Sequence, residues 1–210
     1  MVTVRVPATT ANLGPGFDTL GLALALYNTL TFEELAEGLY FEGVDPEYAT
    51  AENLAVVAYK AVLSKLGLPM PGLRISVQAE IPICRGLGSS AALIAAGAAG
   101  ANANHGSPLT RAELLAVCNA IEGHPDNLAP AIFGGLVASL VENERPYIAR
   151  YSLHKRLRCT ALIPDFQLST HLARGVLPKE VPYGDAIFNV SRTAVLLRAL
   201  EEGDTETISV

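Results

Sequence analysis

A glycine-rich segment between a predicted strand and a predicted helix is the strongest chemical signal in the sequence. Glycines let a backbone fold closely around a ligand, and the first turn of a helix offers unpaired N–H groups with partial positive charge. Two serines add hydroxyl groups for a phosphate or for Mg²⁺. The pattern predicts an anion-binding loop, and a plain strand–turn–helix junction with a serine cap is the alternative. The segment comprises Pro82, Ile83, Cys84, Arg85, Gly86, Leu87, Gly88, Ser89, Ser90, Ala91 and Ala92.

Two familiar nucleotide-binding loops fit this segment poorly. It lacks the Gly-Lys-Ser/Thr ending of a Walker A loop. Gly86, Gly88 and Ala91 match the loose dinucleotide fingerprint, but that fold needs an acidic residue about 20 positions further on, at a strand end. The nearest acidic residue, Glu113, falls in a predicted helix. A dinucleotide-binding oxidoreductase stays open as an alternative, which binding of ATP but not NAD would exclude.

A second cluster combines two carboxylates, an imidazole and an amide within six positions: Glu122, His124, Asp126 and Asn127. Such a set can bind a metal ion, transfer protons or bind a substrate. A lone acidic residue or histidine at a helix end is more often a surface cap. The prolines and glycines around this set favour a functional loop as much as a structural one.

Three further polar positions have both a chemical and a structural interpretation. Asp18 can bind an ammonium or hydroxyl group and Asn12 a carboxylate or hydroxyl group, but both can also stabilise the turn at residues 14–16. Asn53 precedes a predicted helix, so an N-cap is its structural interpretation. Arg174 has the planar fork that matches a substrate carboxylate, whereas a surface arginine is usually only a solvated charge.

The cysteines are odd in number and widely spaced: Cys84, Cys118 and Cys159. Neither a disulfide framework nor a zinc cluster fits that spacing. None of the three has a base nearby in the sequence, so we expect buried, unreactive thiols.

Local patterns predict the elements that position these residues. Residues 19–32 stay open between strand and buried helix, and residues 9–18 and 123–130 are predicted loops. Thr110 and Glu113 form a capping-box pattern at a helix start. Strands are predicted over 2–6, 39–44, 73–79, 133–141, 147–151 and 157–163. Helices are predicted over 52–66, 91–104, 110–122 and 190–200, and from Ser169 onward. This mixture of strands and helices predicts an α+β class.

Composition restricts the function further. The chain has 210 residues, of which 50% are hydrophobic and 17% charged, so a sizeable core is expected and global disorder is excluded. The formal net charge of −6 argues against a nucleic-acid binder. Residues 1–7 lack the apolar core of a secretory signal, and the Ala/Gly-rich stretch 91–104 is too short for a confident membrane span. A cytoplasmic protein is expected.

Residues 82–92 closely resemble the phosphate loop of the small-molecule kinases named after galactokinase, homoserine kinase, mevalonate kinase and phosphomevalonate kinase, the GHMP kinases. Two segments narrow the resemblance to homoserine kinases. Residues 6–23 resemble the first motif of that family, and residues 121–135 resemble the motif that follows the phosphate helix. Residues 170–178 and 189–193 fit as well. Several long motifs in the same order are far more specific than any one of them.

The resemblance implies an enzyme that transfers the γ-phosphate of ATP to the side-chain hydroxyl of L-homoserine, on the way to threonine. Asn53 would lie at the adenine and residues 82–92 would hold the phosphates. Mg²⁺ would bind Ser89 or Ser90 together with Glu122. The implied homoserine contacts are Asn12, Asp18, His124, Asn127 and Arg174.

Catalytic roles are implied for Asn127, Thr170 and Arg174, with the Thr170 hydroxyl near the reacting groups. Related kinases place an aspartate at the position of Asn127. An asparagine amide is no useful base at neutral pH, so we expect direct attack of the hydroxyl on the γ-phosphate. Asp126 is the alternative base, and a turn role beside Pro125 is equally open.

The implied fold has two α+β domains with the nucleotide between them. Residues 1–150 would form the GHMP kinase N-terminal, ATP-binding domain, which resembles the second domain of ribosomal protein S5. Residues 151–210 would begin an incomplete C-terminal α+β domain. Homoserine kinases are longer, with a second substrate arginine and a third glycine-rich motif, so we expect a C-terminally truncated chain whose own activity is open.

The resemblance leaves several alternatives. Another GHMP kinase would act on a different small alcohol, and a non-catalytic chain would only bind nucleotide or a partner. The implied partner is the small molecule L-homoserine, with no nucleic acid and no membrane, and a homodimer is an assembly that the resemblance allows.

Overall fold

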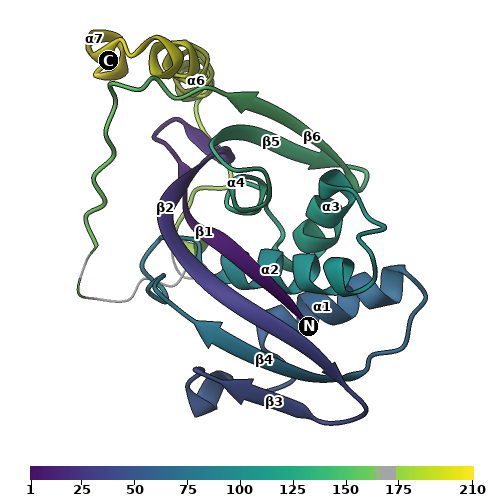
Figure 1. Cartoon of the computed structure of the whole chain (residues 1–210). Helices are drawn as coiled ribbons and strands as arrows, with labels where there is room; N and C mark the ends of the chain where they lie inside the picture. The colour runs from purple at the N-terminus through teal and green to yellow at the C-terminus, as the bar shows by residue number, and fades with distance from the viewer. Residues whose placement is uncertain (164, 166–173) are drawn as a thin grey trace.

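The computed structural model describes residues 1–163, 165 and 174–210 of the chain (Figure 1). Its centre is one six-stranded sheet with a helical layer on one face. The long strand β2 pairs antiparallel with β1, and its other edge pairs antiparallel with β4 and β5. The outer strand β3 runs parallel to β4, and β6 runs antiparallel to β5. The strands are β1 Val2–Asn12, β2 Gly16–Leu35, β3 Leu39–Glu42, β4 Gly72–Gln78, β5 Leu136–Glu142 and β6 Arg145–Tyr151.

Four helices form the layer that covers the sheet: α1 Leu54–Lys65, α2 Ser89–Asn104, α3 Arg111–Glu122 and α4 Leu128–Phe133 (Figure 1). Helix α2 lies at the centre of this layer, and most of its alanines and glycines are buried, which agrees with the buried helix that the sequence predicted. Small residues allow close approach, because a Cβ atom on Gly97 would lie 2.1 Å from the Ala55 carbonyl oxygen of α1. Helix α2 is therefore packed closely against α1 within the core.

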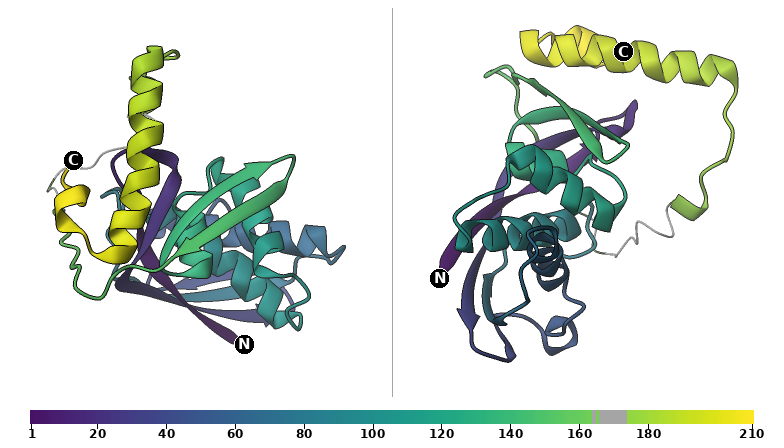
Figure 2. Two further views of the ribbon diagram at one scale, coloured as in Figure 1. Left: turned by 90° about the horizontal axis from the view of Figure 1, so that it is seen from above. Right: turned by 90° about the vertical axis from the view of Figure 1, so that its right-hand side faces the viewer.

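The last part of the chain lies outside this core. Helix α6 (Tyr183–Glu202) is set apart from the helical layer in Figure 2 and buries only Ala199, and the short helix α7 (Thr205–Ile208) follows it. The turn η1 (Pro46–Tyr48) precedes α1. None of the described helices combines the length and the apolar character that crossing a membrane requires.

Several sequence expectations are confirmed. The capping box opens α3: Thr110 Oγ1 accepts the Glu113 N–H, and the Glu113 carboxylate accepts the Thr110 N–H. The helices predicted at 52–66, 91–104 and 190–200 correspond to α1, α2 and part of α6. The expected helix start at Ser169 lies outside the described residues.

Three local expectations are wrong. The predicted loop over residues 9–18 is mostly strand, because β1 and β2 continue their ladder past Pro7 through a register shift and leave only residues 13–15 as a turn. The predicted loop over residues 123–130 ends early, since α4 begins at Leu128. Residues 157–163 form no strand.

The close contact of α2 with α1 makes a stability prediction. Gly97→Ala must push a methyl group against the Ala55 backbone, so we expect a loss of about 1–3 kcal/mol in the free energy of unfolding. The control is Ala99→Ser on the partly exposed side of the same helix, which should change stability by no more than about 0.5 kcal/mol. Urea unfolding measures both, and equal stabilities would contradict this packing.

Candidate active site

A cavity of about 730 Å³ lies where the glycine-rich segment, the start of α1 and the end of α3 meet. It gathers most of the residues that the sequence predicted, although they come from distant parts of the chain. Of the predicted residues, the cavity is lined by Asn12, Asn53, Ile83, Cys84, Arg85, Gly86, Gly88, Ser89, Ser90, Glu122, His124, Asn127 and Arg174. Thr170 lies outside the described residues.

The glycine-rich loop has an alternating backbone conformation. Cys84, Gly86 and Gly88 have φ angles of +55°, +71° and +67°, while Arg85 and Leu87 between them do not have positive φ. Alternation of this kind turns successive N–H groups toward one concave side, which is the geometry of an anion-binding nest. The loop leads directly into α2, whose N-cap Gly88 has no side chain to occupy the helix end. Backbone donors therefore face the cavity.

Buried residues hold this loop in place. Leu87, Ala91 and Ala92 belong to the core, so the side chains of these predicted residues anchor the loop and do not line the cavity. The Leu87 carbonyl accepts a hydrogen bond from the Thr9 N–H at 3.1 Å. Pro82 does not line the cavity either.

Entry into the loop is fixed by Asn28 of β2. Its side chain is 2% exposed, and its Oδ1 accepts the N–H groups of Glu80 and Ile81 at 2.8 and 2.9 Å. These bonds satisfy backbone donors just after β4 ends, where no sheet partner takes them. The sheet therefore sets where the loop begins.

Ser90 and Glu122 meet at the start of α2. The Ser90 hydroxyl donates to Glu122 Oε2 at 2.7 Å, joining the first turn of α2 to the last residue of α3. A hydroxyl and a carboxylate oxygen beside an anion-binding loop are ligands that Mg²⁺ prefers. The donor set fits the expected metal, and Ser90 is the serine in contact with Glu122.

His124 is held by a buried carboxylate. Its Nδ1 lies 2.8 Å from Asp126 Oδ1, and the same oxygen accepts the Asn127 N–H at 2.8 Å. Asp126 is 2% exposed. The hydrogen bond to Asp126 is the main reason that the pKa of His124 is raised above its ordinary value. Asp126 therefore orients its neighbours.

Asp18 and Arg174 form a bidentate ion pair at the cavity edge. Arg174 Nη1 donates to Asp18 Oδ2 at 3.0 Å and Nη2 donates to Asp18 Oδ1. Asn12 Oδ1 accepts the Asp18 N–H at 3.0 Å, so Asn12 holds the turn that presents the carboxylate. Both charged side chains are about one-third exposed, at 37% for Arg174 and 36% for Asp18. A small charged molecule can therefore reach them from solvent.

Asp18, His124 and Asp126 also lie close together, with one potential ligand atom from each within 4.8 Å of the others. Asp18 is paired with Arg174, and Asp126 already holds His124 and a backbone N–H. The cluster is therefore explained by its own hydrogen bonds, and Ser90 with Glu122 fits the metal better.

The structural interpretation of Asn53 is confirmed. Its Oδ1 accepts the Ala55 N–H at 3.0 Å as the N-cap of α1, and its Nδ2 donates to the Tyr48 carbonyl at 2.9 Å. Asn53 also lines the cavity, so capping does not remove it from the candidate site.

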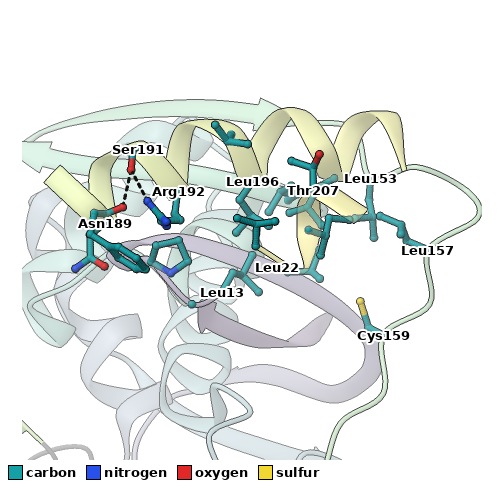
Figure 3. A pocket seen from close by; sticks show the side chains of 18 of the residues that line it. Leu13, Leu22, Leu153, Leu157, Cys159, Asn189, Ser191, Arg192, Leu196 and Thr207 are labelled. Carbon is teal, nitrogen blue, oxygen red and sulfur yellow. Dashed lines mark hydrogen bonds between the residues drawn. The ribbon is translucent and has the colours of Figure 1, made fainter. Parts of the chain in front are cut away.

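A second cavity of about 790 Å³ lies between α6, α7 and the β1–β2 turn (Figure 3). Leucine is the most frequent residue in its wall, which also includes Asn189, Ser191 and Arg192. None of the predicted site residues that the structure describes lines it. Polar groups converge in the cavity beside α2, which is therefore the candidate active site.

The sequence missed Thr9 and Asn28, which support the site from inside the sheet. Thr9 falls in a segment predicted as a loop and Asn28 in one left open between strand and helix, and only their tertiary contacts with the loops after β4 and α3 show their role. No local sequence signal could have found them.

The expectation of three buried cysteines is wrong for two of them. Cys118 is buried, and burial raises the pKa of its thiol to about 12, but Cys84 and Cys159 are exposed. Cys84 belongs to the glycine-rich loop that lines the first cavity, and Cys159 lines the second cavity, so neither thiol is covered by the core.

These thiols allow a labelling test. We expect a disulfide reagent to modify Cys84 and Cys159 in the folded protein and Cys118 only after unfolding. ATP should slow labelling of Cys84 and leave Cys159 unchanged, since Cys159 lines the other cavity. Cys84→Ser and Cys159→Ser variants assign the two rates by mass spectrometry. Equal protection of both thiols would contradict the location of the site.

Comparisons with known proteins show which family the chain resembles. Residues 53–135 match the family model of the GHMP kinases N terminal domain. A homoserine kinase of Clostridium botulinum (strain Loch Maree) is 48% identical over 208 residues, which is 99% of this chain and 70% of that protein.

Solved structures give the same relationship. A Listeria monocytogenes protein assigned as a homoserine kinase superposes with a TM-score of 0.79 and 31% identity, over 99% of this chain and 73% of that one. The homoserine kinase from Cytophaga hutchinsonii also gives a TM-score of 0.79, with 26% identity over 98% of this chain and 70% of that one. The α+β fold is thus that of the GHMP kinases, and the chain belongs to the homoserine kinase family.

Proposed function

We propose that the chain transfers the γ-phosphate of ATP to the side-chain hydroxyl of L-homoserine, giving O-phospho-L-homoserine and ADP, a cytoplasmic step of threonine biosynthesis. One observation carries the proposal: a single cavity joins a loop of backbone donors at a helix start to Arg174, whose guanidinium is paired with Asp18. The first feature suits phosphates, and the second suits an amino acid.

The loop would bind the triphosphate through its backbone. Residues 86–90 supply the N–H groups, and the N-terminus of α2 adds partial positive charge. The Asn53 side of the cavity is left for the adenine. Ser90 and Glu122 would hold Mg²⁺, and the bound ion would neutralise part of the negative charge of the phosphates.

The Asp18–Arg174 pair is complementary to a zwitterion. An α-amino acid brings a carboxylate that can pair with Arg174 and an ammonium group that can pair with Asp18. Both side chains therefore keep an opposite charge as their partner when the amino acid separates them. Asn12 and His124 lie close to Asp18 and would complete the contacts with the amino acid. Asn127, whose Oδ1 lies beside Gly88, would contact the substrate next to the phosphates.

The hydroxyl would attack without a strong protein base. The Asn127 amide is not a useful base, and Asp126 is buried and already accepts hydrogen bonds from the His124 ring and the Asn127 N–H. Phosphoryl transfer through a loose transition state depends mainly on positioning and on neutralising charge. The Thr170 hydroxyl is also proposed to lie near the reacting groups.

We also propose residues 1–150 as the ATP-binding domain and residues 151–210 as the start of a second domain. The sheet supports this boundary, because its last strand β6 ends at Tyr151 and α6 packs outside the core.

Coupled ADP release with ATP, Mg²⁺ and L-homoserine tests the proposed function, with mevalonate and galactose as competing acceptors and EDTA as the metal control. The assay is run on this chain and on a chimera that adds the final segment of the Clostridium botulinum relative. Homoserine-dependent release from either protein supports the proposal. ADP release with mevalonate or galactose but not with homoserine would assign a sibling kinase. The absence of ADP release with all three acceptors would contradict the proposal.

In the protein that is active, Arg174→Ala should raise the KM for homoserine at least tenfold and leave the KM for ATP within about twofold, because a lost charge-assisted pair costs about 1.5–3 kcal/mol. Arg198→Ala is the control, since Arg198 lies on the exposed side of α6 and, among the described residues, forms ion pairs with Glu201 and Glu202 alone. An unchanged KM for homoserine would remove Arg174 from the substrate site.

A further inference from the structure

Thr9 is a buried hydroxyl directly behind the candidate site. It lies in β1 with no exposed surface, and its Oγ1 donates to Asn127 Oδ1 at 2.8 Å. Its backbone N–H donates to the Leu87 carbonyl of the glycine-rich loop at 3.1 Å. One strand residue therefore holds both the loop and the side chain of Asn127.

The hydrogen bond from Thr9 Oγ1 to Asn127 Oδ1 decides which end of the Asn127 amide faces the cavity. A carboxamide has an acceptor oxygen at one end and two N–H donors at the other. The oxygen is taken by Thr9, and the main chain is held because the Asn127 N–H donates to Asp126 Oδ1 at 2.8 Å. Since Asn127 lines the cavity, its NH₂ group is the end left to face a ligand.

The Asn127 NH₂ donor lies near the helix end where the phosphates are proposed to bind. A Cβ atom on Gly88 would lie 2.1 Å from Thr9 Oγ1 and 3.1 Å from Asn127 Oδ1. Gly88 is the N-cap of α2, so the Thr9–Asn127 pair lies against the helix end that suits an anion. An N–H donor held there can stabilise the negative charge of a phosphate, but it cannot accept a proton.

We propose that Thr9 is a positioning residue for phosphoryl transfer, which locks the Asn127 amide with its NH₂ group toward the transferred phosphoryl group. The inference rests on the proposed kinase function and deepens it. A fixed donor stabilises the charge that the phosphoryl oxygens carry in the transition state and needs no reorganisation during the reaction. Asn127 touches the substrate, and Thr9 acts through it.

Kinetics test the coupling of the two residues. Thr9→Val keeps the side-chain size but removes the donor, so kcat should fall about tenfold or more while both KM values stay within about twofold. Thr9→Ser should restore most of the rate. Thr9→Val should add less than a twofold loss when Asn127 is already alanine, because its effect passes through that amide. Equal losses in both backgrounds would overturn the proposal.

The matched control is Thr3→Val, on the same strand. Thr3 Oγ1 lies 3.0 Å from Thr31 Oγ1, so this variant also removes a bond between hydroxyl groups, but on the exposed part of the hairpin. It should leave kcat unchanged.

A spectroscopic readout keeps the inference testable without turnover. In ¹⁵N-labelled protein, the side-chain NH₂ signal of Asn127, assigned by its loss in Asn127→Ala, should shift when a non-hydrolysable ATP analogue with Mg²⁺ is added. The shift should persist in Thr9→Ser and disappear in Thr9→Val. A signal that ignores the nucleotide, or responds equally in Thr9→Val, overturns the role of Thr9. A responsive signal without homoserine-dependent ADP release overturns the proposed substrate instead.

Discussion

The site depends on one steric constraint: no side chain fits at residue 88. Gly88 has a φ of +67°, and a Cβ atom there would lie 2.1 Å from Thr9 Oγ1. Because residue 88 has no side chain, β1, the glycine-rich loop and the segment that carries Asn127 come together at the start of α2. The close contact leaves the helix end open to a ligand, since glycine also offers no cap of its own.

Two sets of groups at the cavity suit different parts of the proposed reaction. The glycine-rich loop offers backbone donors, and beside it Ser90 and Glu122 are joined by a hydrogen bond of 2.7 Å. Asp18 and Arg174 form a pair of opposite charges at the cavity edge. Because that pair is already neutral, it favours a zwitterion over a simple anion as its ligand. This division agrees with a transfer of phosphate to an amino acid.

The sequence predicted the features that depend on neighbouring residues. The capping box of Thr110 and Glu113, the buried alanine-rich helix and the loop over residues 82–90 all follow from local chemistry. The long β1–β2 hairpin was missed, since Gly14 and Pro15 look like the middle of a loop while the strand pairing is a tertiary property. Thr9 and Asn127 are 118 positions apart, so their hydrogen bond has no local signal.

Nucleotide titration calorimetry tests the central claim most directly. Affinity should rise from AMP to ADP to ATP in the unaltered chain, because each added phosphate meets the loop and the start of α2. Gly88→Ala should remove that increase, whereas Gly67→Ala, at a φ of +70° with open space around it, should keep it. Equal affinities for AMP and ATP in the unaltered chain, or an unchanged increase in Gly88→Ala, would contradict the account.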